Sequence, residues 1–303
     1  MNSKKDTVKR LVIYLLIAFI PFWIILPVLN SLYNEPIYTS EKAVPVAYAV
    51  GVFGMLIPSI AHLVTRLITK EGFKNSYLGL NFKGNAKYYI ASVIVKLLEV
   101  FAFVILVWLC FAKDLHFSGI FASDEAVKRI CGYILTIFAS IIVFFPAFGE
   151  EWGWRGYMMP KLTELMGKPL AIIVGGILWG LWHAPLTISG HNFGTDYKFF
   201  PWLGILLMCV FCIFMNAFLT LLTEKTKSIY PASFCHMVNN NCGGMIFISL
   251  FGSEAFIEKI SSVNAITLMP CMMGTSVIVG TISFILIIRD EKTKKNTETA
   301  SKL

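Results

Sequence analysis

Eight long apolar stretches constrain this chain more than any other feature of its sequence. They cover roughly residues 11–30, 43–65, 88–112, 132–149, 169–185, 202–222, 230–251 and 263–288. A helix needs about 20 apolar residues to cross a bilayer, whereas a strand of a membrane β-barrel needs only about 9–11. Backbone groups in lipid must satisfy their own hydrogen bonds, so we expect these stretches to be helices. The sequence therefore predicts an all-α polytopic membrane bundle with about eight transmembrane helices.

The composition argues against most other classes of protein. Only 15% of the residues are charged and the mean hydropathy is +0.70, whereas a soluble domain carries about 25% charged residues. The net charge of +8 does not indicate nucleic-acid binding, because no basic run is interleaved with aromatic residues. We expect a single transmembrane helical domain over residues 1–303, a motif-bearing core over about 132–251 and a flexible cytoplasmic tail over 289–303.

The Lys and Arg side chains predict the orientation of the bundle. If the N-terminus is cytoplasmic, the segments on that side hold 19 of the 26 Lys and Arg residues, the outer loops hold six, and Lys96 lies within a span. Cytoplasmic loops of membrane proteins carry such an excess. We therefore expect both termini in the cytoplasm and a multi-pass protein of the cell membrane. The basic start also fits a signal peptide, but residues 11–30 are long for one and no small-x-small cleavage site follows, so we expect a retained helix.

The first of three polar clusters in the apolar region reads Phe148-Gly-Glu-Glu-Trp-Gly-Trp-Arg-Gly-Tyr157. Ionisable groups inside a membrane are costly, so each is a functional candidate. Glu151 and Arg155 are four residues apart, so on a helix they share a face and can pair. Glu150 points about 100° away from Glu151 and is free for other work. A glutamate in this setting suits a general base, although the acidic start of an interfacial helix would give the same pattern.

The second cluster reads Trp179-Gly-Leu-Trp-His-Ala-Pro185. Trp179 and His183 are four residues apart and share a helical face. An aromatic belt at the membrane interface with a histidine at the end of the span is the alternative interpretation. Gly176 and Gly180 form a surface of small residues, which predicts the close approach of another helix.

The third cluster reads Ser233-Phe-Cys-His-Met-Val-Asn-Asn-Asn241. His236 and Asn240 are four residues apart, and three consecutive amides in a membrane helix are costly unless they meet polar partners. Hydrogen bonds between helices would also explain them. Taken together, the three clusters supply carboxylates, imidazoles and an amide from three separate spans. These groups can activate a water molecule and stabilise an oxyanion.

The order of the three motifs resembles that of the CPBP family of membrane proteases, which includes the type II CAAX prenyl endopeptidases and the bacterial Abi-type proteins. The motifs here are Glu150-Glu151-Trp-Gly-Trp-Arg155, Trp179-Gly-Leu-Trp-His183 and His236-Met-Val-Asn-Asn240. Residues 148–241 carry the resemblance. It implies hydrolysis of a peptide bond inside the membrane.

The resemblance also implies roles for individual residues. Glu150 is expected to be the general base, and His183 to help Glu150 hold the attacking water. His236 and Asn240 are expected to stabilise the tetrahedral oxyanion.

The resemblance also implies supporting roles for Glu151, Arg155 and Trp179. Glu151 and Arg155 are expected to orient the motif helix, and Gly153 and Gly156 to permit close packing. Two histidines and a glutamate could also hold zinc. However, the His-Glu-x-x-His helix motif of soluble metalloproteases is absent. We therefore favour a glutamate-activated water without an obligate metal, with zinc as the alternative.

The depth of the site raises one difficulty. In a simple up-and-down threading, Glu150 lies near the cytoplasmic end of the fourth span and His183 near the outer end of the fifth. The two would then be about 20 Å apart, at 1.5 Å per residue. We therefore expect the fourth span to continue as a helix through about residue 159, which places Glu150 deeper.

These observations predict an intramembrane endopeptidase acting on a peptide or a membrane-anchored protein segment in the bilayer. The substrate need not be prenylated. The alternative is a non-catalytic membrane regulator or bacteriocin-immunity protein that retains the motifs and binds a regulatory membrane partner. A transporter is a third reading, but no pair of corresponding interrupted halves is evident.

Overall fold

The computed structural model describes residues 4–113, 127, 131, 143–241 and 254–300. Within these ranges the regular elements are all helices and no strand occurs. Six of the described helices or joined helices are long and apolar enough to cross a membrane. The predicted all-α membrane bundle is therefore confirmed. The stretches 132–149 and 230–251 lie partly outside the described residues, so the count of eight spans stays a prediction.

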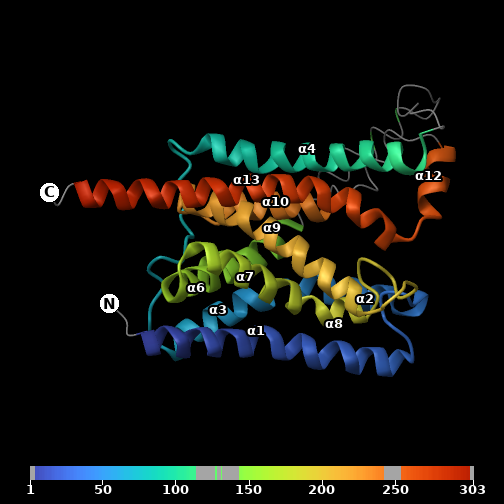
Figure 1. Ribbon diagram of the computed structural model, residues 1–303. Helices are drawn as coiled ribbons and strands as arrows, with labels where there is room; N and C mark the ends of the chain where they lie inside the picture. The colour runs from blue at the N-terminus through green and yellow to red at the C-terminus, as the bar shows by residue number, and fades with distance from the viewer. Residues whose placement is uncertain (1–3, 114–126, 128–130, 132–142, 242–253, 301–303) are drawn as a thin grey trace.

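The long helices lie side by side in one bundle (Figure 1). The outer helices in this view are α1 (Lys4–Tyr33) and α4 (Ala86–Phe111). Between them lie α7 (Lys168–Trp182), α9 (Trp202–Thr226) and α13 (Ala265–Ala300). The start of α1 and the end of α13 lie at the same end of the bundle (Figure 1).

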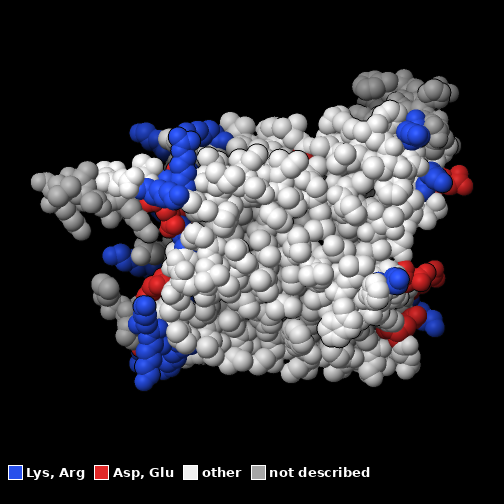
Figure 2. Space-filling model, viewed as in Figure 1, with Lys and Arg blue, Asp and Glu red and all other residues white. Residues whose placement is uncertain are grey.

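We call this end, where α1 begins and α9 and α13 finish, the basic end. Figure 2 shows Lys and Arg gathered there and a wide band without exposed charge across the middle of the visible face. Ion pairs link the helices at the basic end. The pairs are Arg10–Glu71, Lys161–Glu71, Lys168–Glu224 and Lys225–Asp290. This charge distribution is the one that predicted the orientation of the bundle, and the side of the membrane on which it lies stays a prediction.

Two predicted spans are broken, each next to a proline. Residues 43–65 were expected as one helix, but η1 (Glu41–Ala43) leads into α2 (Val44–Gly54), and α3 (Ile57–Ile68) follows after a turn. Residues 169–185 were also expected as one helix, but α7 ends before His183 and α8 (Ala184–Ile188) follows. Pro58 and Pro185 stand in the first turns of α3 and α8. Proline has no N–H to donate to the preceding turn, so each break falls just before it.

The first part of the expected tail is helical. Helix α13 continues as far as Ala300, and the flexibility and cytoplasmic location of this segment stay predictions. Asp290 pairs with Lys225, and Glu291 lies 3.8 Å from Lys168. These contacts tie the first turn of the expected tail to the ends of α7 and α9.

Helices α7 and α9 approach each other closely, as the small residues predicted. A Cβ added to Gly176 would lie 2.4 Å from the Cα of Ile213, and one added to Gly180 would lie 2.4 Å from the Cα of Cys209. Real Cβ atoms do not approach this closely, so larger side chains would push the helices apart. The predicted close approach is therefore confirmed.

The inward face of α1 packs on the same core. Its buried positions repeat every three or four residues, which is the period of one helical face. They are Leu11, Tyr14, Ala18, Phe22 and Leu26. This spacing brings Tyr14 and Phe22 to the aromatic core around the polar motifs.

Candidate active site

The first motif lies on a helix that continues past the predicted end of the fourth apolar stretch. Residues 143–153 are helical, a π-helical turn follows as η3 (Trp154–Met158), and α6 (Met159–Met166) completes the helix. The expectation that this helix continues through about residue 159 is confirmed. Single π turns inside α-helices often mark functional sites. A Cβ on Gly153 would lie 2.3–2.6 Å from atoms of Pro58, so this position allows α3 to approach the motif helix.

Glu150 is buried, and one of its carboxylate oxygens is held by two indoles. Trp179 Nε1 donates to Glu150 Oε1 at 2.5 Å, and Trp154 Nε1 donates to the same oxygen at 3.1 Å. Trp154 comes from the helix that carries Glu150, whereas Trp179 comes from α7. Two donors from separate elements fix the orientation of the carboxylate. Its second oxygen, Oε2, lies 3.9 Å from Nε2 of His236.

Glu151 joins the first motif to the third. Arg155 Nη1 donates to Glu151 Oε1 at 3.0 Å, as the four-residue spacing predicted. His236 on α10 (Tyr230–Asn241) lies with Nδ1 at 2.7 Å from the same oxygen. An ionised carboxylate can only accept, so Nδ1 carries the proton of this bond. The bond fixes the imidazole with Nε2 turned toward Glu150.

Trp179 contacts Arg155 and His236 as well as Glu150. The guanidinium carbon of Arg155 lies 4.2 Å from the centroid of a Trp179 ring, and the imidazole of His236 lies 5.5 Å from it, edge to face. Glu150, Glu151, Arg155, Trp179 and His236 therefore form one buried cluster from three elements. The sequence singled out each of these five residues.

His183 and Asn240 lie at the margin of this cluster. His183 Nδ1 lies 2.9 Å from the carbonyl oxygen of Trp179, and the His183 and Trp179 rings are 6.0 Å apart. Asn240 is exposed, one turn beyond His236, with Nδ2 at 3.8 Å from the sulfur of Met55. Trp179 thus links His183 to the cluster, and α10 links Asn240 to it. The catalytic roles of both residues stay predictions.

Sequence reasoning missed three residues that support the cluster. Trp154 lies four residues after Glu150, and this spacing could have identified it. Tyr14 is fully buried, and its ring packs 5.9 Å from that of Trp154. His62 Nδ1 lies 2.9 Å from the carbonyl oxygen of Trp152, in the motif helix. Tyr14 and His62 come from distant spans, and no local pattern marks them.

The described part of the site does not fit a metal centre. Within that part of the chain, no group of three or more His, Cys, Asp or Glu side chains is placed to hold an ion. Glu150 Oε1 and Glu151 Oε1 are already occupied by indole, guanidinium and imidazole donors. The remaining atoms of these side chains are Glu150 Oε2, Glu151 Oε2 and His236 Nε2, and they are not arranged as such a group.

The segment that carries this cluster is similar to known proteins. Residues 132–242 match the family described as type II CAAX prenyl endopeptidase Rce1-like. A CAAX prenyl protease 2 of Methanococcus maripaludis is 37% identical over 59 residues, which are 18% of this chain and 21% of the relative. The chain thus covers about a fifth of the length of that relative. The match agrees with the resemblance that the motifs predicted: residues 132–242 are similar to the type II CAAX prenyl endopeptidase Rce1-like family.

Proposed function

We propose that this chain is an intramembrane endopeptidase in which Glu150 activates water to hydrolyse a peptide bond. The observation that carries the proposal is the arrangement of the Glu150 carboxylate. Two indoles hold Oε1, while Oε2 lies 3.9 Å from Nε2 of His236. A water molecule that hydrogen bonds both groups would be held at the base. The family match supports the same reaction class.

In the proposed reaction, Oε2 of Glu150 accepts a proton from water while the water oxygen attacks the carbonyl carbon of the peptide. The carbonyl oxygen then carries negative charge. Preorganised donors aimed at such an oxyanion supply a large part of catalysis in acyl transfer. The proton next passes from Glu150 to the amide nitrogen, and the carbon–nitrogen bond breaks. The Glu150 carboxylate therefore acts as the base in the first step and as the acid in the second.

His236 and Asn240 are the proposed donors to the oxyanion. They lie on one face of α10. The bond between His236 Nδ1 and Glu151 turns Nε2 into the site, and Nε2 would donate to the oxyanion with the imidazole doubly protonated. Asn240 is exposed and lies one helical turn beyond His236. His183 is proposed to help hold the attacking water, from its place next to Trp179. We propose a mechanism without an obligate metal.

The proposed substrate is a peptide or a membrane-anchored protein segment. The proposed location is the cell membrane, with the basic end of the bundle and both termini in the cytoplasm. The family is described as CAAX prenyl endopeptidases and the relative as a CAAX prenyl protease, which raises the question whether the substrate is prenylated. For this chain it is a hypothesis that a comparison of prenylated and unmodified peptides would test.

The central test is Glu150→Gln, which keeps the shape of the side chain and removes its basicity. We expect membranes carrying this variant to lose peptide products that wild-type membranes release, while the protein still inserts and folds. Glu164→Gln is the matched control. Glu164 lies on α6, which continues the helix of Glu150, and its carboxylate accepts a hydrogen bond from Thr7 at 2.8 Å, away from the cluster. Cleavage is also expected to persist with a zinc chelator.

Other outcomes would contradict the proposal. Normal cleavage by Glu150→Gln would exclude Glu150 as the base. A cellular phenotype that is unchanged in this variant, without any cleavage by the wild type, would favour the non-catalytic membrane regulator. Loss of cleavage with the chelator and recovery with zinc would contradict the metal-free mechanism.

A further inference from the structure

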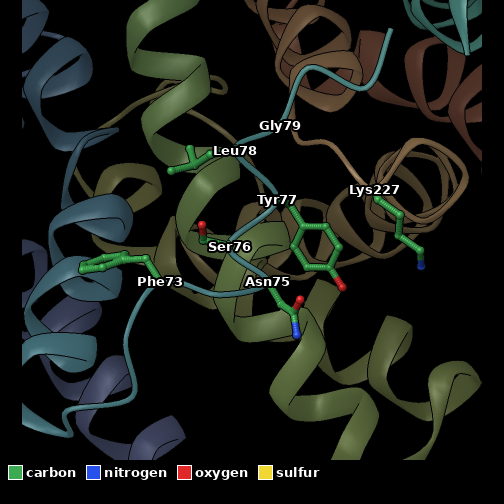
Figure 3. Close-up of a pocket in the computed structure, with 7 residues that line it drawn as sticks. All are labelled: Phe73, Asn75, Ser76, Tyr77, Leu78, Gly79 and Lys227. Carbon is green, nitrogen blue, oxygen red and sulfur yellow. The ribbon is translucent and has the colours of Figure 1, made fainter. Parts of the chain in front are cut away.

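A hollow in the molecule lies at the basic end, away from the Glu150 cluster. It is a pocket of about 530 Å³, lined by Phe73, Asn75, Ser76, Tyr77, Leu78, Gly79 and Lys227. The first six belong to the loop between α3 and α4, and Lys227 follows the end of α9 (Figure 3). The motif region and the loop that precedes it in the sequence therefore share this pocket.

The polar side chains of the pocket suit an anion. Figure 3 shows Asn75, Tyr77 and Lys227 extending their polar ends to one side of the loop, whereas Phe73 and Leu78 extend to the other. Together they offer an amide, a hydroxyl and an ammonium group, all of which can donate to phosphate oxygens. Burial raises the pKa of Tyr77. Its hydroxyl therefore stays protonated and available as a donor near neutral pH.

The walls of the pocket are held in place by the core. Trp152 Nε1 donates to the carbonyl oxygen of Ser76 at 3.1 Å, and the amide of Ile229 donates to the carbonyl oxygen of Tyr77 at 3.1 Å. Asn81 Nδ2 donates to the carbonyl oxygen of Lys227 at 2.9 Å, which fixes the residue after α9. The pocket is therefore preformed and does not depend on a ligand to order it.

The surroundings of the pocket fit the interface between lipid and water. Four large apolar side chains of this loop are exposed, with exposed fractions of 41–58% (Phe73, Leu78, Leu80 and Phe82). Exposed Lys74 and Lys83 stand among them in the sequence. Apolar side chains that enter the boundary of the acyl chains, combined with lysines, are typical of segments that contact anionic lipids.

We propose that this pocket binds the phosphate of an anionic phospholipid headgroup, with Lys227, Asn75 and Tyr77 as donors. The exposed apolar side chains of the loop would contact the acyl chains of the same lipid. Free phosphate offers the same oxygen atoms, but it would leave these apolar side chains without a partner. The bond between Ser76 and Trp152 places the bound lipid against the motif helix.

The test measures lipid binding to the full chain purified in a neutral detergent. Native mass spectrometry would follow retention of phosphatidylglycerol, with phosphatidylcholine as the uncharged competitor. We expect Lys227→Gln to weaken phosphatidylglycerol binding by at least about fivefold, the size of one lysine at an anionic surface. Asn75→Ala should weaken it by at least about fivefold as well, because it removes a hydrogen bond to a charged group. Lys83→Gln is the matched control, because it removes the same charge from an exposed position outside the pocket lining.

Three results would overturn the proposal. Equal losses for Lys227→Gln and Lys83→Gln, with Asn75→Ala unchanged, would indicate general attraction to the basic end. Equal retention of phosphatidylcholine would show that the headgroup charge is not recognised. Displacement of phosphatidylglycerol by inorganic phosphate alone, at similar affinity, would assign the pocket to the free ion. If Lys227→Gln does not fold, Asn75→Ala still decides between these outcomes because it changes no charge.

Discussion

Two tryptophans on α7 allow a sharp test of how Glu150 is held. Trp179 Nε1 donates to the Glu150 carboxylate at 2.5 Å, whereas Trp182 Nε1 donates to the backbone carbonyl oxygen of Ala18 at 2.9 Å. Both side chains are nearly fully buried. Replacement of either residue by Phe keeps an aromatic ring and removes one N–H donor. The two variants therefore differ mainly in which acceptor loses its partner.

The expected magnitudes follow from the two bonds. A hydrogen bond to a charged group contributes about 1.5–3 kcal/mol, and one between neutral groups about 0.5–1.5 kcal/mol. If the Trp179 bond orients the base in the transition state, Trp179→Phe should lower kcat by about 10-fold to 100-fold. Trp182→Phe should lower the unfolding temperature and leave kcat within about threefold of the wild type.

The assay is turnover of a peptide whose cleavage depends on Glu150, by the full chain in liposomes. Thermal unfolding of each variant serves as the control for folding. Equal losses of kcat in Trp179→Phe and Trp182→Phe would refute the reasoning, because a general packing defect would then explain both. Unchanged kcat in Trp179→Phe would show that the indole does not position the base.

Two further predictions concern α1 and the loop after α8. Tyr14 packs against Trp154, which donates to Glu150, so Tyr14→Leu should lower kcat about tenfold. Phe22→Leu on the same helix is the control and should mainly lower the unfolding temperature. Equal kcat in the two variants would contradict a role of Tyr14 in positioning Trp154. Burial lowers the pKa of His191 from 6.5 to about 4. The unfolded chain then takes up a proton between these pH values that the folded chain excludes, so stability falls as the pH falls through this window. His191→Gln should reduce that loss of unfolding temperature, and an identical pH slope would contradict the prediction.

The sequence predicted the parts of this protein that depend on local pattern. Apolar length identified the helices, and four-residue spacing identified the pair of Glu151 and Arg155. The spacing of Gly176 and Gly180 identified the contact of α7 with α9. Each of these features is decided within one or two helical turns, so the sequence alone carries the information.

Contacts between distant spans could not be predicted in the same way. The bond of His236 to Glu151 joins residues 85 positions apart, and Trp179 reaches Glu150 across 29 positions. The motifs indicated that these groups belong together, but nothing local indicated which atoms meet. The helix breaks before Pro58 and Pro185 were missed for another reason. Apolar length was counted across them, although proline interrupts the hydrogen bonds of a helix.

The packing of Tyr14 against the indole that binds Glu150 limits what can be moved to another protein. The family match covers residues 132–242, but that segment receives Tyr14 from α1 and His62 from α3. Transplanting the matched segment alone would leave the Trp154 indole and the Trp152 carbonyl without these neighbours. The smallest transferable unit therefore also includes the first and third helices.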